Sequence, residues 1–286
     1  MQGVVKFSDS EYPTLLKTIK SPPKQLYYKG KLDSEIFVNC LAVVGSRKMT
    51  TYGKQATQKI VSEIATLGVT IVSGFMYGID ATAHKAALEG GGRTIAVMPC
   101  GINMIHPAYQ EDLYTQILKN NGLIISEYEG ATLPQLWTYP QRNRIIAGLS
   151  LGTLVVEAGE NSGSLITAGF AKKFKRKIFS VPGPINSSVS YGTLQLIKEG
   201  ASVVSSAEDI LLHYGITNTI TKDARSGNQD LSKLEASIIE TLKNEPQEID
   251  VLARKLKVSA SQISSAISIM QIKGLIQQEG AKFYVN

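Results

Sequence analysis

The sequence predicts an α/β protein whose main part is a doubly wound, mostly parallel sheet, followed by a small second domain. Two observations predict the sheet: short apolar runs rich in β-branched residues recur between residues 41 and 204, and helical patterns alternate with them. Strands that are apolar on both faces and joined by helices are typical of a Rossmann-like sheet. The expected strands are 41–44, 69–72, 94–98, 123–125, 153–156, 177–181 and 202–204.

The segments around this sheet suggest further boundaries. Residues 1–40 show no repeated pattern and carry Pro13, Pro22 and Pro23, so we expect a helical and extended lead-in that packs on the sheet. The Rossmann-like domain is then expected over residues 41–216. Residues 217–231 are polar and rich in turn formers, as a linker is, and the second domain follows over residues 232–286.

The second domain combines three helical patterns with two short strand patterns. Apolar residues recur at helical spacing in 234–242, 249–256 and 263–270, and 275–278 with 281–285 fit a hairpin around Gly280. This order predicts a winged helix-turn-helix. The third helix carries only Lys273 as a cation, whereas helices that follow phosphates carry several. Protein contact or an auxiliary role is therefore favoured over sequence-specific DNA reading.

Composition sets the broad class. A chain of 286 residues with 43% hydrophobic residues can form one large and one small core. The net charge of +6 permits a polyanionic partner without requiring one, and residues 1–216 hold 21 Lys and Arg against 16 Asp and Glu. No apolar run has membrane length and the first residues show no signal-type region, so a cytoplasmic protein without membrane contact is expected. Cys40 and Cys100 lack metal-ligand spacing and are expected to be buried thiols.

Small or polar residues follow nearly every predicted strand. They include 45–47, 73–74, 100–101, 126–127, 159–164 and 182–183. Ligands of open parallel sheets bind beyond the carboxyl ends of the strands, so these loops should converge on one site. Arg47 would stand at this edge, where its guanidinium suits a phosphate, although a salt bridge at the sheet edge is the alternative. Neither the dinucleotide nor the triphosphate glycine motif is present, so no nucleotide cofactor is expected.

Residues 139–169 carry the strongest functional signal. Pro140 disfavours a helical Tyr139, and an extended chain would place Arg142 and Arg144 on one side. The loop 157–164 then leads into a helical stretch from Leu165, and its N–H groups and the helix N-terminus favour an anion. Two guanidinium groups, an aromatic ring and an anion site together indicate a nucleic-acid strand, with Tyr139 either stacking on a base or packing in the core.

Two other groups have competing interpretations. Asp80 and His84 lie four residues apart and could be metal ligands or an acid–base pair, but a helix-capping Asp80 and a locally bonded His84 are favoured. We expect no catalytic residue and no metal site. Residues 172–177 hold the densest basic cluster, which is either an auxiliary nucleic-acid track or an ordinary set of cations at a helix C-terminus.

Ordered motifs along the chain resemble the DprA/Smf (DNA processing protein A) family. They are RNRIIAGLS (142–150), VVEA (155–158), SGSLITA (162–168) and PG (182–183), preceded by YP (12–13), LYYKG (26–30), GSR (45–47), SG (73–74), GID (78–80) and SE (126–127). The resemblance covers roughly residues 10–213. Three positions depart from the pattern: Asn103 and His106 stand where relatives usually have Asp and Tyr, and Met76 replaces an alanine.

The resemblance implies a single-stranded DNA-binding protein of natural transformation and recombination. Such a protein protects incoming DNA and helps to load the RecA recombinase, it is not an enzyme, and it forms a homodimer, here through residues 191–212. The residue chemistry and the resemblance together give the expected DNA-binding residues: Gly45, Ser46, Arg47, Tyr139, Arg142, Asn143, Arg144, Ser162, Gly163 and Ser164.

Two alternatives belong to other functional classes. Rossmann-like nucleotide-binding enzymes of the nucleoside-monophosphate ribohydrolase type have a P-G-G-x-G-T-x-x-E motif, and the corresponding loop here, GENSGSLITA, lacks its glutamate. A regulatory winged-helix repressor would require tight binding to one duplex sequence.

Overall fold

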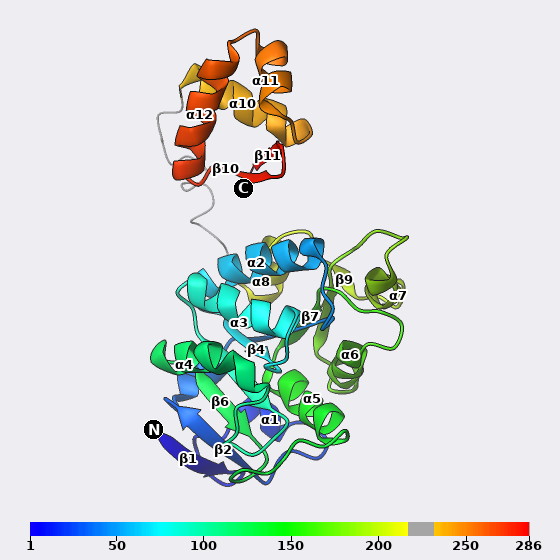
Figure 1. Ribbon diagram of the computed structural model, residues 1–286. Helices are drawn as coiled ribbons and strands as arrows, with labels where there is room; N and C mark the ends of the chain where they lie inside the picture. Colours follow the sequence, from blue (N-terminus) through cyan, green and yellow to red (C-terminus); the bar gives the residue numbers. More distant parts are fainter. Residues whose placement is uncertain (217–231, 286) are drawn as a thin grey trace. The chain divides into compact units, whose positions relative to one another are not determined.

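The computed structural model describes residues 1–216 and 232–285, which fall into two compact units (Figure 1). The first unit is built on one nine-stranded sheet in the order β1-β2-β6-β5-β4-β3-β7-β8-β9. Its strands are β1 (Gln2–Lys6), β2 (Gln25–Gly30), β3 (Cys40–Val44), β4 (Thr70–Ser73), β5 (Thr94–Met98), β6 (Leu123–Ser126), β7 (Gly152–Val155), β8 (Lys177–Ser180) and β9 (Ser202–Val203). All seven predicted strands are present, and the predicted fold class is confirmed.

The sheet is parallel from β6 to β9, and its order reverses at β3. Strand β3 pairs with β4 on one side and with β7 on the other, so β4, β5 and β6 extend one way while β7, β8 and β9 extend the other. The chain that follows β3 therefore leads to β4 on one side, and the chain that follows β7 leads to β8 on the other side. This is the topological switch point, where open parallel sheets bind their ligands.

The N-terminal residues differ from the prediction. Residues 1–40 do not simply pack on the sheet; they extend it, because β1 and β2 form an antiparallel pair and β2 runs antiparallel to β6. In β2, Leu26 is buried, while Tyr27, Tyr28 and Lys29 are partly exposed. A strand with mixed exposure has no continuous apolar run, so the pattern that revealed the buried strands could not reveal this one.

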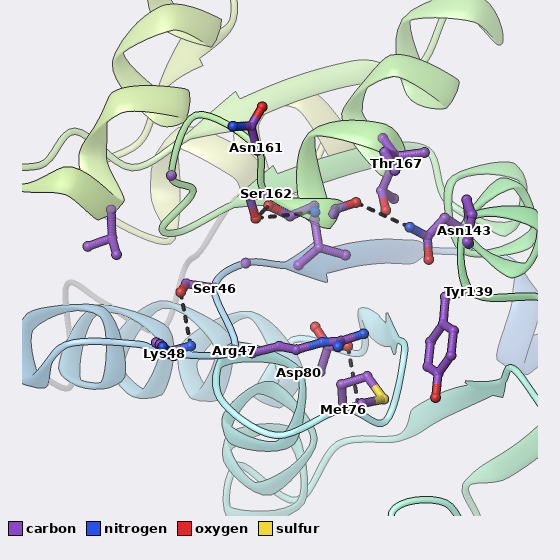
Figure 2. Close-up of a pocket in the computed structure, with 18 of the residues that line it drawn as sticks. Ser46, Arg47, Lys48, Met76, Asp80, Tyr139, Asn143, Asn161, Ser162 and Thr167 are labelled. Carbon is purple, nitrogen blue, oxygen red and sulfur yellow. Dashed lines mark hydrogen bonds between the residues drawn. The ribbon is translucent and has the colours of Figure 1, made fainter. Parts of the chain in front are cut away.

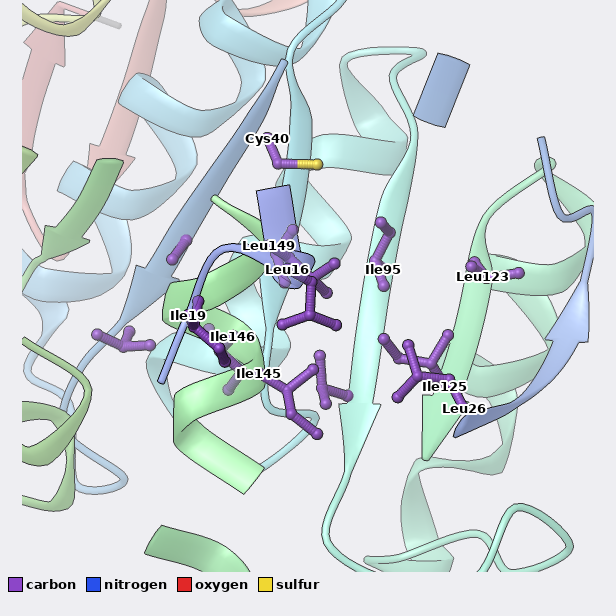
Figure 3. Close-up of a cluster of buried hydrophobic side chains, with 14 of the residues drawn as sticks. Leu16, Ile19, Leu26, Cys40, Ile95, Leu123, Ile125, Ile145, Ile146 and Leu149 are labelled. Carbon is purple, nitrogen blue, oxygen red and sulfur yellow. The ribbon is translucent and has the colours of Figure 1, made fainter. Parts of the chain in front are cut away.

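Helices cover both faces of the sheet. They are α1 (Thr14–Lys17), α2 (Thr51–Thr66), α3 (Ile79–Glu89), α4 (Glu111–Lys119), α5 (Thr138–Leu149), α6 (Gly163–Lys173), α7 (Tyr191–Lys198) and α8 (Glu208–Leu211), with short 3-10 turns at Ser34–Phe37, Ala108–Gln110, Ser188–Ser190 and Leu212–Tyr214. Successive side chains of β3 point to opposite faces of the sheet. Ala42 and Val44 join the cluster that contains α5, whereas Leu41 and Val43 join the cluster that contains α2. Figure 3 shows the first of these clusters, with Ile145, Ile146 and Leu149 of α5 among its members.

The second unit is a winged helix. It comprises α10 (Lys233–Asn244), α11 (Ile249–Leu256), α12 (Ala260–Ile272), β10 (Ile276–Glu279) and β11 (Lys282–Val285). Capping boxes begin α10 at Ser232 and α12 at Ser259, and each satisfies backbone N–H groups of the first helical turn. Its core includes Ile238, Leu252 and Met270. The predicted linker, residues 217–231, lies outside the described residues.

Two further expectations concern the thiols and membranes. Cys40 and Cys100 are both buried and unpaired, as predicted. Within residues 1–216 and 232–285, no helix combines the length and the apolar character that crossing a bilayer requires.

The packing of α5 gives a stability prediction. Leu149 is fully buried, so Leu149→Ala should lower the free energy of unfolding of the first unit by about 2–5 kcal/mol, because a cavity remains between α5 and the sheet. The measurement is urea unfolding followed by the fluorescence of Trp137, the single tryptophan, which lies in this unit. Leu133 is 64% exposed, and Leu133→Ala should change the same free energy by less than about 0.5 kcal/mol. Equal losses in the two variants would contradict the packing of α5.

Candidate nucleic-acid interface

A pocket of about 750 Å³ opens at the switch point of the sheet (Figure 2). The loop after β3, the loop between β7 and α6, and the first turns of α5 line it. Nine of the ten residues predicted to bind DNA lie around this pocket: Gly45, Ser46, Arg47, Tyr139, Arg142, Asn143, Ser162, Gly163 and Ser164. Arg144 is not among its lining residues. Predicted residues as far apart in the sequence as Gly45 and Ser164 thus meet at the carboxyl ends of the parallel strands, as expected.

Close backbone contacts hold the loop that carries Arg47. The Ile79 N–H donates a hydrogen bond to the Ser46 carbonyl at 3.2 Å. Gly78 has φ of +81°, and a Cβ there would lie 2.4 Å from that same carbonyl oxygen, so only glycine permits this approach. Gly45 is equally tight, since its Cβ would lie 2.6 Å from the Ile79 side chain. The glycines around this loop therefore fix the backbone from which Arg47 projects.

Arg47 is exposed and lies between two aromatic rings. Its guanidinium carbon is 5.3 Å from the centroid of the Tyr139 ring and 5.8 Å from that of Tyr77, within the range of cation–π attraction. Among the ion pairs of residues 1–216 and 232–285, none includes Arg47 or Lys48. The salt bridge that competed with a binding role for Arg47 is therefore not formed in the part of the chain that the structure describes. The five N–H donors remain available to an anion.

The N-terminus of α6 faces the same pocket. Ser162 is the N-cap residue, and its hydroxyl accepts a hydrogen bond from the Ser164 N–H at 3.4 Å. Asn143 of α5 donates to the Gly163 carbonyl at 3.2 Å, which ties the two helices together. A Cβ added at Gly163 would meet no protein atom within 4 Å, so this side of the helix end is open. Eleven residues of aligned peptide dipoles favour an anion here.

The extended conformation predicted for residues 139–144 is wrong, because these residues form the first turns of α5. Pro140 lies in the first turn, where its missing N–H has no acceptor within the helix. Ile145, Ile146 and Leu149 are buried, and each contributes about 1.5–3 kcal/mol of apolar burial only if the segment is helical. This gain exceeds the local preference of the residue before proline. Two helical residues two positions apart lie about 200° apart, so Arg142 and Arg144 do not share a face.

Arg142 is buried behind the pocket. Its Nη1 donates short hydrogen bonds to the carbonyls of Gly74 and Val97, at the ends of β4 and β5. Burial lowers the pKa of Arg142 to about 10, and the carboxylate of Asp80 opposes this shift. Burial likewise raises the pKa of Asp80, with Arg142 opposing. The guanidinium therefore supplies a fixed positive charge to the pocket floor rather than an exposed fork.

Arg144 points to a different partner. Its Nη2 donates to both carboxylate oxygens of Glu127 at 2.6 and 2.7 Å, and the two side chains are 11% and 20% exposed. Glu127 directly follows β6, which lies three strands from β3 in the sheet. This ion pair therefore joins α5 to the carboxyl end of β6. The predicted convergence of Arg142 and Arg144 on one ligand is therefore not found.

The Asp80 and His84 pair is not arranged as a shared site. Asp80 accepts a hydrogen bond from the Met76 N–H at 3.4 Å, whereas His84 is bonded through Nδ1 to the Thr94 hydroxyl at 2.7 Å. Burial lowers the pKa of His84 to about 3, so its ring is neutral. In the described ranges, no group of three His, Cys, Asp or Glu side chains is placed to hold a metal ion. The bond to Thr94 fits the favoured local role of His84. Asp80 does not cap the helix as expected, because Gly78 is the N-cap residue of α3 and Asp80 lies inside the first turn.

The basic cluster of residues 172–177 lies at the opposite edge of the sheet. It follows the C-terminal end of α6 and includes the first residue of β8, whereas the pocket lies beyond the last residues of β3 and β7. Lys172 pairs with Glu199 at 3.3 Å, and Arg176 donates to the Leu15 carbonyl and the Thr18 hydroxyl. The cluster is therefore separate from the pocket, and two of its cations already have protein partners.

Sequence reasoning missed two residues at the rim of the site. Tyr77 follows β4 and lies against Arg47, and His106 follows β5 and is bonded to Tyr139. Both come after the carboxyl end of a strand, which is the same signal that located Arg47. The signal was present in the glycines of these two loops, but neither loop carries an arginine that would have drawn attention to its aromatic residue.

The fold and the pocket define a class: a Rossmann-like domain with a pocket at its switch point that is lined by Arg47, Lys48 and Arg142, joined in sequence to a winged helix. The family model of DNA recombination-mediator protein A matches residues 3–215, and that of the DprA winged helix domain matches residues 222–282. The chain belongs to the DNA recombination-mediator protein A family, and the resemblance in its motifs is confirmed.

Relatives and solved structures agree with this assignment. Protein Smf of Synechocystis is 36% identical over 311 residues, which cover 96% of this chain and 78% of that protein. The structure of DNA processing protein A from Streptococcus pneumoniae has a TM-score of 0.70 at 39% identity and covers 74% of each chain. That of DNA processing protein A from Helicobacter pylori has a TM-score of 0.65 at 31% identity, covering 78% of this chain and 99% of the other. The latter concerns that protein's single-stranded DNA binding mode.

A structural His84 predicts a definite pH dependence of stability. Its pKa is lower in the folded than in the unfolded chain, so the unfolded state binds more protons as the pH falls below about 6.5 and stability decreases. Between about pH 7 and pH 5.5 this group alone should cost about 1 kcal/mol. Urea unfolding at both values, compared between the wild type and His84→Gln, measures the difference. An identical pH dependence in the two proteins would contradict a buried, neutral His84.

Proposed function

We propose that the pocket at the switch point binds single-stranded DNA. The phosphates of the strand would contact Arg47 and the N-terminus of α6, while one of its bases stacks on the Tyr139 ring. The observation that carries this proposal is Arg47, an exposed guanidinium held between two tyrosine rings without an ion-pair partner in the described chain, beside the open end of a helix. The Helicobacter pylori relative, whose solved structure concerns single-stranded DNA binding, supports it.

Unpaired bases suit this site better than a duplex. The pocket is recessed between loops, and its aromatic side chain can stack on a base only if that base is not paired within a helix. Phosphate contact and stacking are available to every nucleotide, so binding should tolerate any sequence. We therefore propose preference for single strands over duplex of equal length.

The three arginines have different roles in this proposal. Arg47 contacts phosphate directly, because its donors face the pocket. Arg142 adds a positive charge from its buried position behind the pocket. Its Nη1 remains hydrogen-bonded to the carbonyls of Gly74 and Val97. Arg144, which was expected to contact DNA, instead holds α5 through its bidentate pair with Glu127. Gly45, Ser46 and Asn143 act by fixing the loop and the helix end.

Membership of a recombination-mediator family supports a wider role. We propose that the protein protects incoming DNA in the cytoplasm during natural transformation and recombination, and that it helps to load RecA. A homodimer through residues 191–212 fits the surface there. Strand β9 is a sheet edge, and Val203 and Leu212 are 50% and 67% exposed. Light scattering of the wild type and a Leu212→Glu variant would test this association.

The winged helix is proposed to contact protein rather than to read duplex DNA. Exposed residues of α12 include Ser261, Gln262, Ser264 and Ser268, which are uncharged. Lys273, at the end of this helix, forms an ion pair with Glu235 at 2.7 Å. Its charge is therefore already compensated within the same unit, and little electrostatic attraction for phosphate remains.

A non-enzymatic role is proposed over the ribohydrolase alternative. Asp80 lines the pocket, but it is buried beside Arg142 and bonded to the Met76 N–H. Purified protein should therefore release no ribose 5-phosphate from nucleoside monophosphates. Release that Asp80→Asn abolishes would restore the enzymatic interpretation.

Two substitutions separate charge from stacking. Arg47→Ala should reduce the slope of log affinity against log salt by about 0.7, because one phosphate contact is lost, and Arg47→Lys should recover only part of the affinity. Tyr139→Ala should cost about 1–3 kcal/mol with little change in slope. Fluorescence anisotropy with a labelled oligonucleotide across a salt series measures both effects.

Arg93→Ala provides a matched control for the charge change. Arg93 lies just before β5, at the edge of the sheet away from the pocket, so its loss should leave the affinity nearly unchanged. Circular dichroism of each variant checks folding. Wild-type affinity in a folded Arg47→Ala protein would overturn the proposed site, and equal affinity for single strands and duplex at matched salt would remove the stacking argument.

A further inference from the structure

His106 and Tyr139 form a hydrogen-bonded pair at the rim of the pocket. The Nε2 atom of His106 lies 2.7 Å from the Tyr139 hydroxyl oxygen, and the two rings are 6.1 Å apart with an interplanar angle of 62°. The guanidinium of Arg47 extends across the pocket toward the same tyrosine (Figure 2) and lies 5.3 Å from its ring centroid. The hydroxyl end of Tyr139 is thus fixed by the histidine, and its ring lies against the cation.

Cations dominate the electrostatic surroundings of His106. Burial, then Arg47 from the loop after β3 and Arg142 from α5, hold the pKa of His106 below its ordinary value. Tyr139, also on α5, is its hydrogen-bond partner, and the Asp80 carboxylate of α3 acts on Arg142. The imidazole is therefore neutral near pH 7 while the pocket is empty of an anion. A hydrogen bond between a neutral imidazole and a phenol can form with Nε2 as acceptor and the hydroxyl as donor.

We propose that His106 is a positioning residue for strand binding, which holds the Tyr139 ring in place for stacking and gains a proton when a phosphate group reaches Arg47. The inference rests on the proposed function and adds a residue that is not among those expected to bind DNA. No covalent step is involved. The proton comes from solvent, and the hydrogen bond to Tyr139 persists with Nε2 as donor.

The direction of the pH effect follows from the charges. A bound phosphate offsets the positive charge of Arg47, so the pKa of His106 rises on binding and the complex holds more protons than the free protein. Affinity therefore increases as the pH falls through the pKa of the complex, and it levels off below the pKa of the free protein. Wild-type binding should tighten about three- to tenfold from about pH 8 to about pH 5.5, since one unit of pKa difference corresponds to a factor of ten.

Two substitutions at His106 separate positioning from protonation. In His106→Gln the side-chain amide can still bond to the Tyr139 hydroxyl but does not titrate, so affinity near pH 8 should stay within about twofold while the pH dependence disappears. In His106→Phe both the hydrogen bond to the Tyr139 hydroxyl and the titrating group are lost, so affinity should fall several-fold at every pH. His213 packs against Phe179 and Tyr214, away from the pocket, and His213→Gln should keep the wild-type pH profile.

The experiment measures anisotropy of labelled oligothymidylate with the full-length protein and each variant, at constant ionic strength, with circular dichroism at each pH. A double-mutant cycle of His106→Phe with Tyr139→Phe near pH 8 tests whether His106 acts through the tyrosine: once the hydroxyl is gone, His106→Phe should change affinity no further. A pH profile of His106→Gln equal to that of the wild type overturns the inference, and so does additivity in the cycle. If the wild type does not bind the oligonucleotide at any pH, the proposed function fails as well, whereas binding that is independent of pH rejects the role of His106 alone.

Discussion

The buried guanidinium of Arg142 is the interaction on which the pocket depends. It joins α5 to two strands at once through the carbonyls of Gly74 and Val97. A buried charge costs several kcal/mol unless it is compensated. Here two carbonyls accept from Nη1 and the Asp80 carboxylate favours the charged form, while Nε has no hydrogen-bond partner among the described residues. The close approach also determines the sequence around it, because a Cβ at Gly74 would lie 2.4 Å from Nη1. Tyr139 and Asn143 sit on the same helix, so their positions at the pocket follow from this anchor.

The pocket combines a fixed charge with an available one. Arg142 is held by the protein, whereas Arg47 is held only by tyrosine rings and can turn toward a ligand. Two cations so close repel: burial lowers the pKa of Arg142 most, and Arg47 lowers it further. An arrangement that is unfavourable in the free protein is expected where an anion binds, because the anion relieves the repulsion.

The sequence predicted the sheet and the location of the site better than it predicted the geometry within the site. Buried parallel strands are recognisable because both faces are apolar, and the site follows from the rule that loops meet at their carboxyl ends. Strands β1 and β2 escaped detection because both are of mixed exposure and neither has such an apolar run. The conformation of residues 139–144 was misjudged because the preference before Pro140 is local, whereas the burial of Ile145, Ile146 and Leu149 against the sheet is tertiary. The roles of Tyr77 and His106 depend on contacts between loops far apart in the sequence, which no local pattern contains.

The three arginines near this site show why residue type alone does not define a binding role. All three carry the same group, and the motif that contains Arg142 and Arg144 suggests a symmetrical pair. Arg142 is buried, and its guanidinium donates to backbone carbonyls. Arg144 lies on the other side of α5 and forms a bidentate ion pair with the Glu127 carboxylate. Of the three, Arg47 alone is exposed and forms no salt bridge among the described residues, although the Asp80 carboxylate acts on it electrostatically. Its neighbours are aromatic rings, which attract a cation less strongly than a carboxylate does and so leave its donors to a phosphate. Availability of the donors, set by packing, therefore decides which guanidinium can bind a strand.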